Sequence, residues 1–386
     1  MTVSSRTRVV FYCPESFSLF EGGHDGPRSG GAGIKIYNAA SQLAKSDKYE
    51  VSFLFPDDVK QLTHPTITFH HIRSPIKQRA PVLSRYLSAS QLDNLLPGDG
   101  PLVMVSTMDE YVERFTSYAK RLDAVSIYWV ASDHDVISPR GVASDKSKDV
   151  LDLIAGCDGV IAQSQYQQDV LLQTRGKQSL VIPTGWPLGD DPPPIDEREY
   201  VLWVGAIKYH KQPWYFIDLA IQNPGEQFVM IGPPTQESQR QSSFYSYVIN
   251  RAKEVPNLTF IDQQISLSAI GQYFRDAKVF VNTSAFEGFP NTFIQAMGAG
   301  TPLLSLNVNP DGFMETANCG ICANGNLQQL DKALGKLLND DELRSEMGLQ
   351  ARRYAVARHD ITKTIHQLER MIQSVLKSCS LSGSSR

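Results

Sequence analysis

Short, uninterrupted apolar runs alternate with segments of helix length along the whole sequence. A strand that is buried on both faces of a sheet has a continuous apolar run, so these runs favour parallel sheets. Strands that alternate with helices form βαβ units and doubly wound sheets. The series occurs twice, which predicts an α/β protein with two Rossmann-like, doubly wound, parallel-sheet domains. The runs lie at residues 8–13, 51–55, 67–72, 102–106, 125–130, 160–163 and 180–183, and again at residues 200–205, 228–232, 258–261, 279–282 and 302–306.

A proline-rich segment separates the two series. Its three consecutive prolines, residues 192–194, can continue neither a helix nor an inner strand, so we expect an extended connector there. After the second series, two helices are expected, followed by a tail rich in Ser and Gly. The predicted divisions are an N-terminal domain (1–186), a linker (187–198), a C-terminal domain (199–358), a last helix (359–377) and a disordered tail (378–386).

The charge and the apolar content exclude several classes of protein. The 386 residues include 37 Lys and Arg against 41 Asp and Glu, so the net charge is -4 and the chain lacks the basic field that nucleic-acid binding requires. No apolar run approaches the ~20 residues that span a bilayer. The polar start, residues 1–8, differs from a signal peptide. We therefore expect a soluble, cytoplasmic protein without a nucleic-acid partner.

The five cysteines are too few and too scattered to form a disulfide framework in a chain of this length. Cys319 and Cys322 have the spacing of half a zinc site, but no second pair lies nearby, and no metal site is expected there.

Residues 73–97 place Lys77, Arg79 and Arg85 among leucines. Such cations could contact the anionic cytoplasmic face of a membrane. A solvated helix face is the commoner explanation, and both interpretations stay open.

The segment over residues 282–302 contains the densest group of candidate binding residues. A buried strand leads into a loop with Glu287 and Gly288, and Pro290 then stands where proline is tolerated at a helix start. The amides and the positive dipole end of this helix would suit a diphosphate. Gln295 lies about 7 Å along the helix axis from its start. The alternative is a plain strand–loop–helix in which Glu287 caps the helix, and the residues alone do not separate the two.

Residues 287–302, EGFPNTFIQAMGAGTP, resemble the donor-site signature of retaining GT-B glycosyltransferases of the family 4, or group 1, type. The resemblance implies a GT-B fold, with two Rossmann-like domains facing a cleft, and a last helix that crosses back to the first domain. It implies that Glu287 contacts the transferred sugar. Gln295 stands where the family has a ribose-binding glutamate; it retains an acceptor but lacks the charge. The residues between them that the resemblance assigns to the donor site are Gly288, Phe289, Pro290, Asn291 and Thr292.

Residues 201–220, VLWVGAIKYHKQPWYFIDLA, are similar to a second segment of that family. The resemblance aligns Lys211 with the lysine that neutralises the donor diphosphate, and it places Ala206 where the family has an arginine. Lys208 is close enough to substitute for that arginine, although an ammonium group lacks the bidentate fork of a guanidinium.

The N-terminal half contributes two further candidates. A long loop over residues 14–28 precedes a glycine-rich helix start that is similar to the Gly-Gly loop of the family, which assigns Gly31 to the donor site. A dinucleotide fingerprint is the competing interpretation, but G-x-G-x-x-G is not met. Asp133, His134 and Asp135 could form a metal site in principle. The resemblance instead makes His134 the histidine that contacts the donor sugar, without a metal.

The resemblance as a whole implies transfer of a hexosyl unit from a nucleotide-diphosphate sugar to an acceptor hydroxyl, with retention and without metal or cofactor. Glu287, Lys211 and His134 would be the catalytic residues. The acceptor would be a glycan, a lipid or a small molecule, and the oligomeric state is left open. Two alternatives remain. One is a GT-B sugar-nucleotide epimerase, and the other is a non-catalytic GT-B subunit of a partner transferase, which Ala206 and Gln295 motivate.

Overall fold

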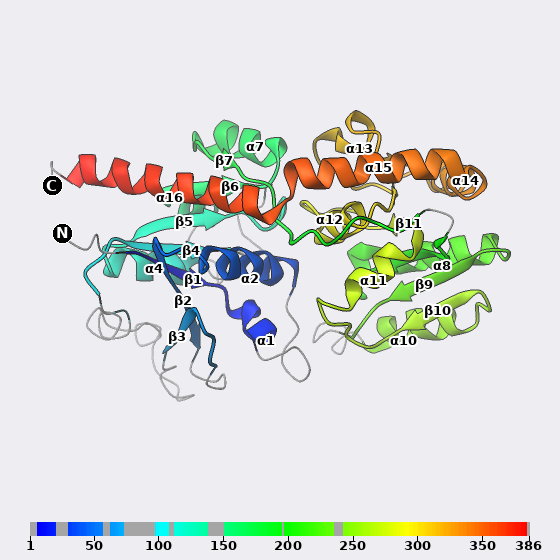
Figure 1. Cartoon of the computed structure of the whole chain (residues 1–386), viewed down its shortest axis with the longest axis horizontal. Coiled ribbons are helices and arrows are strands. Elements are labelled where there is room, and N and C mark those ends of the chain that lie inside the picture. The colour runs from blue at the N-terminus through cyan, green and yellow to red at the C-terminus, as the bar shows by residue number, and fades with distance from the viewer. Residues whose placement is uncertain are drawn as a thin grey trace. The chain divides into compact units, whose positions relative to one another are not determined.

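A computed structural model shows two compact units, which Figure 1 draws in one view. Contacts divide the chain into unit 1, Met1–Gly185 with Ile361–Arg386, and unit 2, Trp186–Asp360. The structure describes residues 6–20, 30–56, 62–72, 96, 98–107, 112–137, 150–194, 197–234 and 242–383.

Unit 1 is built on a parallel sheet of seven strands in the order β3-β2-β1-β4-β5-β6-β7. The central strand β1 pairs with β2 on one side and β4 on the other, so that Val9 lies opposite Val51 and Val103. This is the strand order of a doubly wound fold, as the apolar runs predicted. The strands are β1 (Thr7–Tyr12), β2 (Tyr49–Pro56), β3 (Ile67–Ile72), β4 (Leu102–Ser106), β5 (Val125–Trp129), β6 (Gly159–Ala162) and β7 (Leu180–Val181).

Helices cover both faces of this sheet because successive strand residues point to opposite faces. Val9 and Phe11 belong to one core, to which α2 and α16 contribute, whereas Val10 and Tyr12 belong to another, shared with α4, α6 and α7. The helical segments are η1 (Pro14–Ser16), α1 (Phe17–Phe20), α2 (Gly31–Leu43), α4 (Val112–Arg121), α5 (His134–Ile137), α6 (Val150–Ala155), α7 (Gln165–Arg175) and α16 (Ile361–Gly383).

The C-terminal helix α16 is part of the core of unit 1. Its buried side chains recur at intervals of three or four residues and form one apolar face that packs against α2 and β5. Gly159, at the start of β6, allows the helix to come close, since a Cβ there would lie 2.5 Å from Cε of Met371. The helix runs to Gly383, so the prediction of disorder over residues 378–386 is wrong for residues 378–383. These residues continue the regular turns of a helix that is already anchored.

Unit 2 has a parallel sheet of six strands in the order β10-β9-β8-β11-β12-β13. Its strands are β8 (Tyr200–Val204), β9 (Gln227–Ile231), β10 (Leu258–Ile261), β11 (Ala277–Asn282), β12 (Leu303–Ser305) and β13 (Gly320–Cys322). The last strand, β13, was not predicted from the sequence. It contains Cys322, and both Cys319 and Cys322 are buried free thiols.

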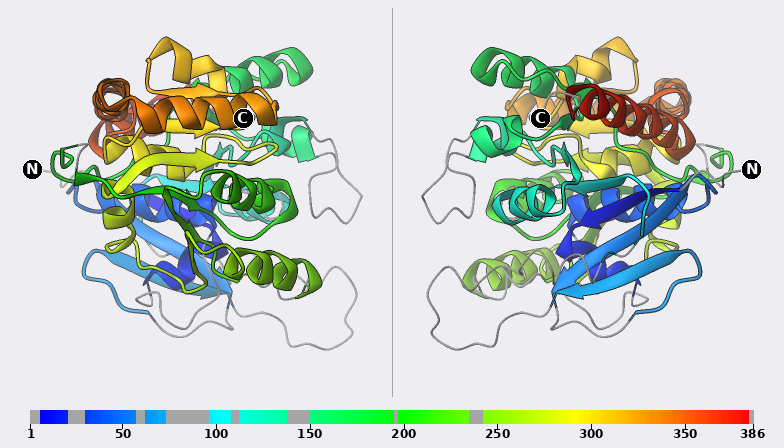
Figure 2. Two further views of the ribbon diagram at one scale, coloured as in Figure 1. Left: turned by 90° about the vertical axis from the view of Figure 1, so that its right-hand side faces the viewer. Right: turned by 90° about the vertical axis from the view of Figure 1, so that its left-hand side faces the viewer.

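Helices lie on both faces of this sheet as well, as the end-on views of Figure 2 show. One core joins α8, α10 and α14 to the sheet, and a second core joins α11, α12, α13 and α15 to its other face. The helical segments are η5 (Tyr209–Lys211), α8 (Pro213–Gln222), α10 (Ser242–Lys253), α11 (Ile270–Arg275), α12 (Asn291–Gly298), η6 (Pro310–Gly312), α13 (Phe313–Thr316), α14 (Leu327–Asn339) and α15 (Asp341–Arg358).

The proline-rich segment belongs to unit 2 and packs onto it. Arg275 donates to the carbonyls of Asp190 and Asp191, at 3.3 and 3.1 Å. Arg198 is buried, and its guanidinium donates to the carbonyls of Ala277 and Ala299. The described part of the predicted linker, within residues 187–198, is therefore held to unit 2 by arginine hydrogen bonds to main-chain carbonyls.

Among the residues that the structure describes, no helix has the length and apolarity to cross a membrane. The basic stretch over residues 73–97 lies outside the described residues apart from Leu96.

The place of α16 in the core of unit 1 leads to a stability prediction. Leu368 is fully buried, so Leu368→Ala should lower the free energy of unfolding of unit 1 by about 2–5 kcal/mol. Leu381, on the same helix, is 70% exposed, and Leu381→Ala should change the stability by less than about 0.5 kcal/mol. Denaturant unfolding followed by circular dichroism measures both. Equal effects of the two substitutions would contradict the packing of α16.

Candidate functional site

Two loops meet at the carboxyl ends of neighbouring strands in unit 2. One follows β8 and contains Lys208 and Lys211; the other follows β11 and contains Glu287. Since β8 and β11 are parallel neighbours, both loops leave the same edge of the sheet. The amide of Ala285 donates to the carbonyl of His210 at 2.8 Å, which joins the loops by their backbones.

Glu287 and Lys211 form an ion pair between these loops. Nζ of Lys211 donates to Oε1 of Glu287 at 2.6 Å, and the side chains are 21% and 15% exposed, respectively. The same oxygen accepts from Oγ of Ser284 at 2.6 Å and from Nδ2 of Asn282 at 3.3 Å. Three side-chain donors thus converge on Oε1.

The charge of Glu287 follows from this environment. Burial raises the pKa of the carboxyl group, but the Lys211 ammonium and the hydrogen bonds from Lys211, Ser284 and Asn282 outweigh burial and hold the pKa below its ordinary value. Glu287 is therefore ionised at neutral pH. The hydrogen bonds of Glu287 come from side chains, so the structure does not support the interpretation of Glu287 as a helix cap.

The loop after Glu287 ends at the start of α12. Pro290 is the N-cap residue, in an extended conformation, and it has no side-chain capping bond, while Asn291 and Thr292 are the first helical residues. Pro290 was predicted at the first position of the helix, and the structure moves that boundary by one residue. The first amides of α12 remain a group of donors at the positive end of the helix.

Four other predicted donor residues have distinct surroundings. The ring of Phe289 packs at 5.1 Å from that of Phe313 and at 4.5 Å from that of His359, so the side chain anchors the loop to the core of unit 2. Gly288, beside it, is buried, and Gln295 is half-buried in the second turn of α12. Lys208 precedes the turn η5, and its carbonyl accepts from the amide of Lys211 at 3.0 Å.

In unit 1, Gly31 is the exposed first residue of α2, after the N-cap Gly30. The amide of Gly30 donates to Oε2 of Glu15 at 3.3 Å. The end of α2 that was predicted to bind the donor therefore has an acidic side chain beside it. Residues 21–29 of the preceding loop lie outside the described residues.

His134 is the first residue of the short helix α5, and its acidic neighbours are engaged in hydrogen bonds. The buried carboxylate of Asp135 accepts from the amide of Ala131 at 2.7 Å and from the hydroxyl of Tyr128 at 3.0 Å. Asp133 accepts from Nε2 of Gln167 at 2.9 Å. No group of three or more metal-ligating side chains occurs in the part of the chain that is described.

Lys35, whose buried ammonium lies at the carboxyl end of β5, was not among the residues predicted from the sequence. Nζ of Lys35 donates to the carbonyl of Val130 at 2.7 Å and lies 5.1 Å from the centre of the Trp129 ring. Burial lowers the pKa of Lys35 to about 7, against the opposing effect of Asp135. A lysine at a core position of an amphipathic helix was the available signal. Ser284 and Asn282 were also missed, although they flank the end of a buried strand.

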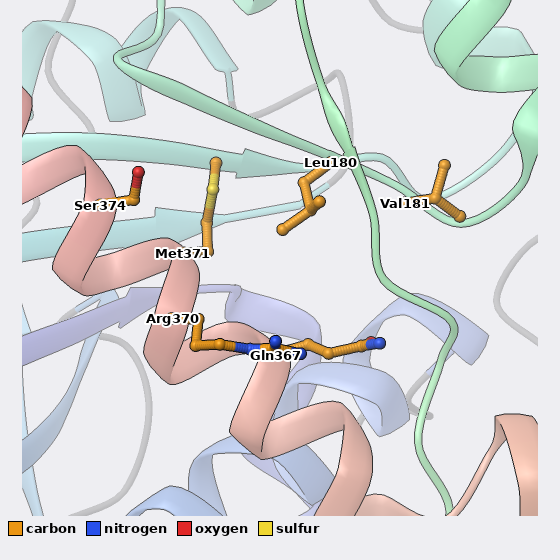
Figure 3. A pocket seen from close by; sticks show the side chains of 6 residues that line it. All are labelled: Leu180, Val181, Gln367, Arg370, Met371 and Ser374. Atoms are coloured by element: carbon orange, nitrogen blue, oxygen red, sulfur yellow. The ribbon is translucent and has the colours of Figure 1, made fainter.

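A pocket of about 390 Å³ lies in unit 1, between the edge strand β7 and α16 (Figure 3). None of the predicted site residues lines it. The lining residues are Leu180, Val181, Gln367, Arg370, Met371 and Ser374.

Comparison with known proteins shows which family profile and which folds the chain resembles. The family profile described as "Glycosyl transferases group 1" matches residues 190–354, which include both loops of the candidate site. YtcC of Bacillus subtilis (strain 168), which carries a glycosyltransferase name, is 25% identical over 190 residues, 47% of this chain and 47% of that protein. The match therefore spans about half the length of this curated relative.

Several solved structures match nearly the whole chain, and two of them serve as examples. Sucrose-phosphate synthase from Thermosynechococcus elongatus has a TM-score of 0.74 at 18% identity and covers 97% of this chain and 100% of its own. HepE of Anabaena, in complex with UDP and glucose, has a TM-score of 0.71 at 16% identity and covers 95% of this chain and 99% of its own. At these identities the likeness concerns the fold. Residues 190–354 therefore match the glycosyl transferase group 1 profile, and the chain has the GT-B fold.

Proposed function

We propose that this protein is a retaining glycosyltransferase that moves a hexosyl unit from a nucleotide-diphosphate sugar to an acceptor hydroxyl without a metal ion. The observation that supports this most directly is the Lys211–Glu287 pair at the carboxyl edge of the unit 2 sheet, beside the start of α12. The family of residues 190–354 and the UDP and glucose bound by HepE point to the same class of donor.

In the proposed reaction, the bond between the anomeric carbon and the diphosphate oxygen breaks, and its electron pair leaves with the diphosphate. The acceptor hydroxyl forms the new bond on the same face, and its proton passes to the departing phosphate oxygen. Negative charge therefore builds up on the diphosphate. Lys211, Lys208 and the first amides of α12 are the groups assigned to stabilise that charge.

Glu287 is assigned to the transferred sugar. Oε1 is occupied by three donors, so Oε2 is the oxygen assigned to accept from a sugar hydroxyl. A charge-assisted bond of this kind orients the sugar strongly. His134 of unit 1 is assigned to a further sugar hydroxyl, Gln295 to the ribose, and Gly31 to the backbone that approaches the donor.

A binding panel tests the donor class. UDP, GDP, ADP and TDP are added to the intact chain, with and without EDTA, and the melting temperature is measured. Ligand at 100 times its dissociation constant adds about 2.7 kcal/mol of stability, a shift of a few degrees. We expect one nucleotide to raise the melting temperature equally in both buffers. A flat panel would contradict the proposal and favour the non-catalytic subunit, which Ala206 and Gln295 suggest.

Substitution of the ion pair tests the catalytic assignment. Glu287→Gln and Lys211→Met should each lower kcat/KM for the nucleotide sugar by about 10²–10³-fold, because each removes a charge aimed at the reacting groups. The melting temperature should change little. Steady-state kinetics with the donor identified by the panel measures the loss.

Glu226 supplies the matched control. It pairs with Lys278 at 2.7 Å in the same unit, with similar exposure, away from the two loops. Glu226→Gln should leave kcat/KM unchanged. If Glu226→Gln and Glu287→Gln lowered the rate equally, the loss would reflect stability and the assignment would be wrong.

The pKa of Glu287 gives a pH prediction. In the wild type this pKa lies below its ordinary value, so the ionised form persists above it and sugar-nucleotide binding falls only as the pH drops through it. Lys211→Met removes the cation but keeps the burial that raises the pKa. The acid limb of binding should therefore move to higher pH in Lys211→Met. Calorimetric titrations between pH 4 and 8 would show it, and an unmoved limb would contradict the role of Lys211 in holding Glu287 ionised.

A further inference from the structure

Lys211 is held by its main chain as well as by its ammonium group. Oγ1 of Thr283 donates to the carbonyl of Lys211 at 2.7 Å. The same Oγ1 accepts from Nε1 of Trp203 at 3.0 Å. Thr283 is fully buried and Trp203 is 2% exposed, so water does not compete for these bonds. A relay of two hydrogen bonds thus runs from the indole in β8, through the hydroxyl after β11, to the peptide unit of Lys211.

That peptide unit lies next to a strained residue. Gln212 has φ 47° and ψ 50°, the left-handed region, and Pro213 follows it as the first residue of α8. A left-handed conformation costs a residue other than glycine about 1–2 kcal/mol. Such a conformation persists only where the surroundings impose it. The hydroxyl of Thr283 binds the carbonyl of the residue directly before Gln212.

The relay is separate from the backbone bond between Ala285 and His210. That bond needs no particular side chain, and it keeps the two loops together whatever stands at position 283. Loss of the hydroxyl would therefore loosen the direction of Lys211 without releasing the loop.

We propose that Thr283 and Trp203 are positioning residues that hold Nζ of Lys211 in one place beside Glu287, ready to meet the diphosphate of the donor. This inference rests on the proposed function. Both side chains are buried beneath the loop, so they act through Lys211 and not by contact with the donor. A displacement of about 1 Å in a charged group is enough to weaken its action on a ligand or a transition state.

Thr283→Val tests the relay, because it replaces the hydroxyl with a methyl group at nearly constant volume. The affinity for the nucleoside diphosphate identified by the panel should fall about tenfold, as for the loss of one well-placed hydrogen bond. The affinity for the corresponding nucleoside, which has no phosphate for Lys211, should stay unchanged. Thr283→Ser keeps the hydroxyl and should restore the diphosphate affinity. Isothermal titration calorimetry measures each of these affinities.

Thr301 provides a closely matched control in the same unit. It is also fully buried, and its hydroxyl donates to the carbonyl of Phe274 at 2.6 Å and accepts from Arg198 at 2.6 Å. Thr301→Val should cost similar stability without changing the ratio of diphosphate to nucleoside affinity. If Thr283→Val left that ratio at the wild-type value, or lowered it only as Thr301→Val does, the positioning role would be overturned.

A spectroscopic measurement separates this inference from the proposed function. The indole N–H resonance of Trp203, assigned by its loss in Trp203→Phe, should shift in Thr283→Val and stay in place in Thr283→Ser. An unshifted resonance in Thr283→Val would overturn the relay whatever the ligand results. A wild-type chain that binds no nucleoside diphosphate would instead overturn the proposed function, and with it the role of the relay in donor binding.

Discussion

The common direction of the strands is the constraint on which the candidate site depends. In a parallel sheet every carboxyl end lies at the same edge, and the strand faces are filled by apolar side chains from both covering layers. Polar groups that follow the strands can therefore gather only at that edge. Because β8 and β11 are neighbours, Lys211 and Glu287 meet there although 76 positions separate them in the sequence. The order of the strands, more than any local motif, brings the ion pair together.

The sequence predicted the parts of the structure that depend on local pattern. Continuous apolar runs located β1 to β12, and Pro290 marked the start of α12 to within one residue. The edge strand β13 was harder to predict, because it has only three residues, one of them a glycine, and so lacks a clear apolar run. The tail of α16 has a similar explanation: residues 378–383 have a weak helix propensity, and an anchored helix extends through them at little further cost.

The sequence could not predict which atoms meet. Phe289 belongs to a motif that resembles a donor site, yet its ring packs among Phe313 and His359. A motif identifies the segment, but the direction of each side chain depends on the elements packed around it. Thr283 and Trp203 show the same limit, since nothing in their spacing of 80 positions predicts a hydrogen bond. Lys35 is a related case. The sequence pattern places it on the buried face of α2, but its acceptors, the carbonyls of Val130 and Trp129, lie at the end of β5, far away in the sequence.

The chain departs from the family pattern at Ala206 and Gln295 but matches it at Lys211 and Glu287. Ala206 offers no cation and Gln295 no carboxylate, and both changes would be harmless in a subunit that only supports a partner. Such a subunit would have no use for Glu287, whose side chain is 15% exposed. It would also not need the buried hydrogen bond by which Thr283 holds Lys211 beside that carboxylate. Buried ion pairs contribute little to stability compared with apolar side chains of similar volume, because both charges lose their hydration. The strained backbone of Gln212 adds to that cost. An arrangement that adds little to stability, and that brings one cation and one carboxylate oxygen to the sheet edge, is better explained by a ligand that uses both. This balance favours a working donor site over a vestigial one.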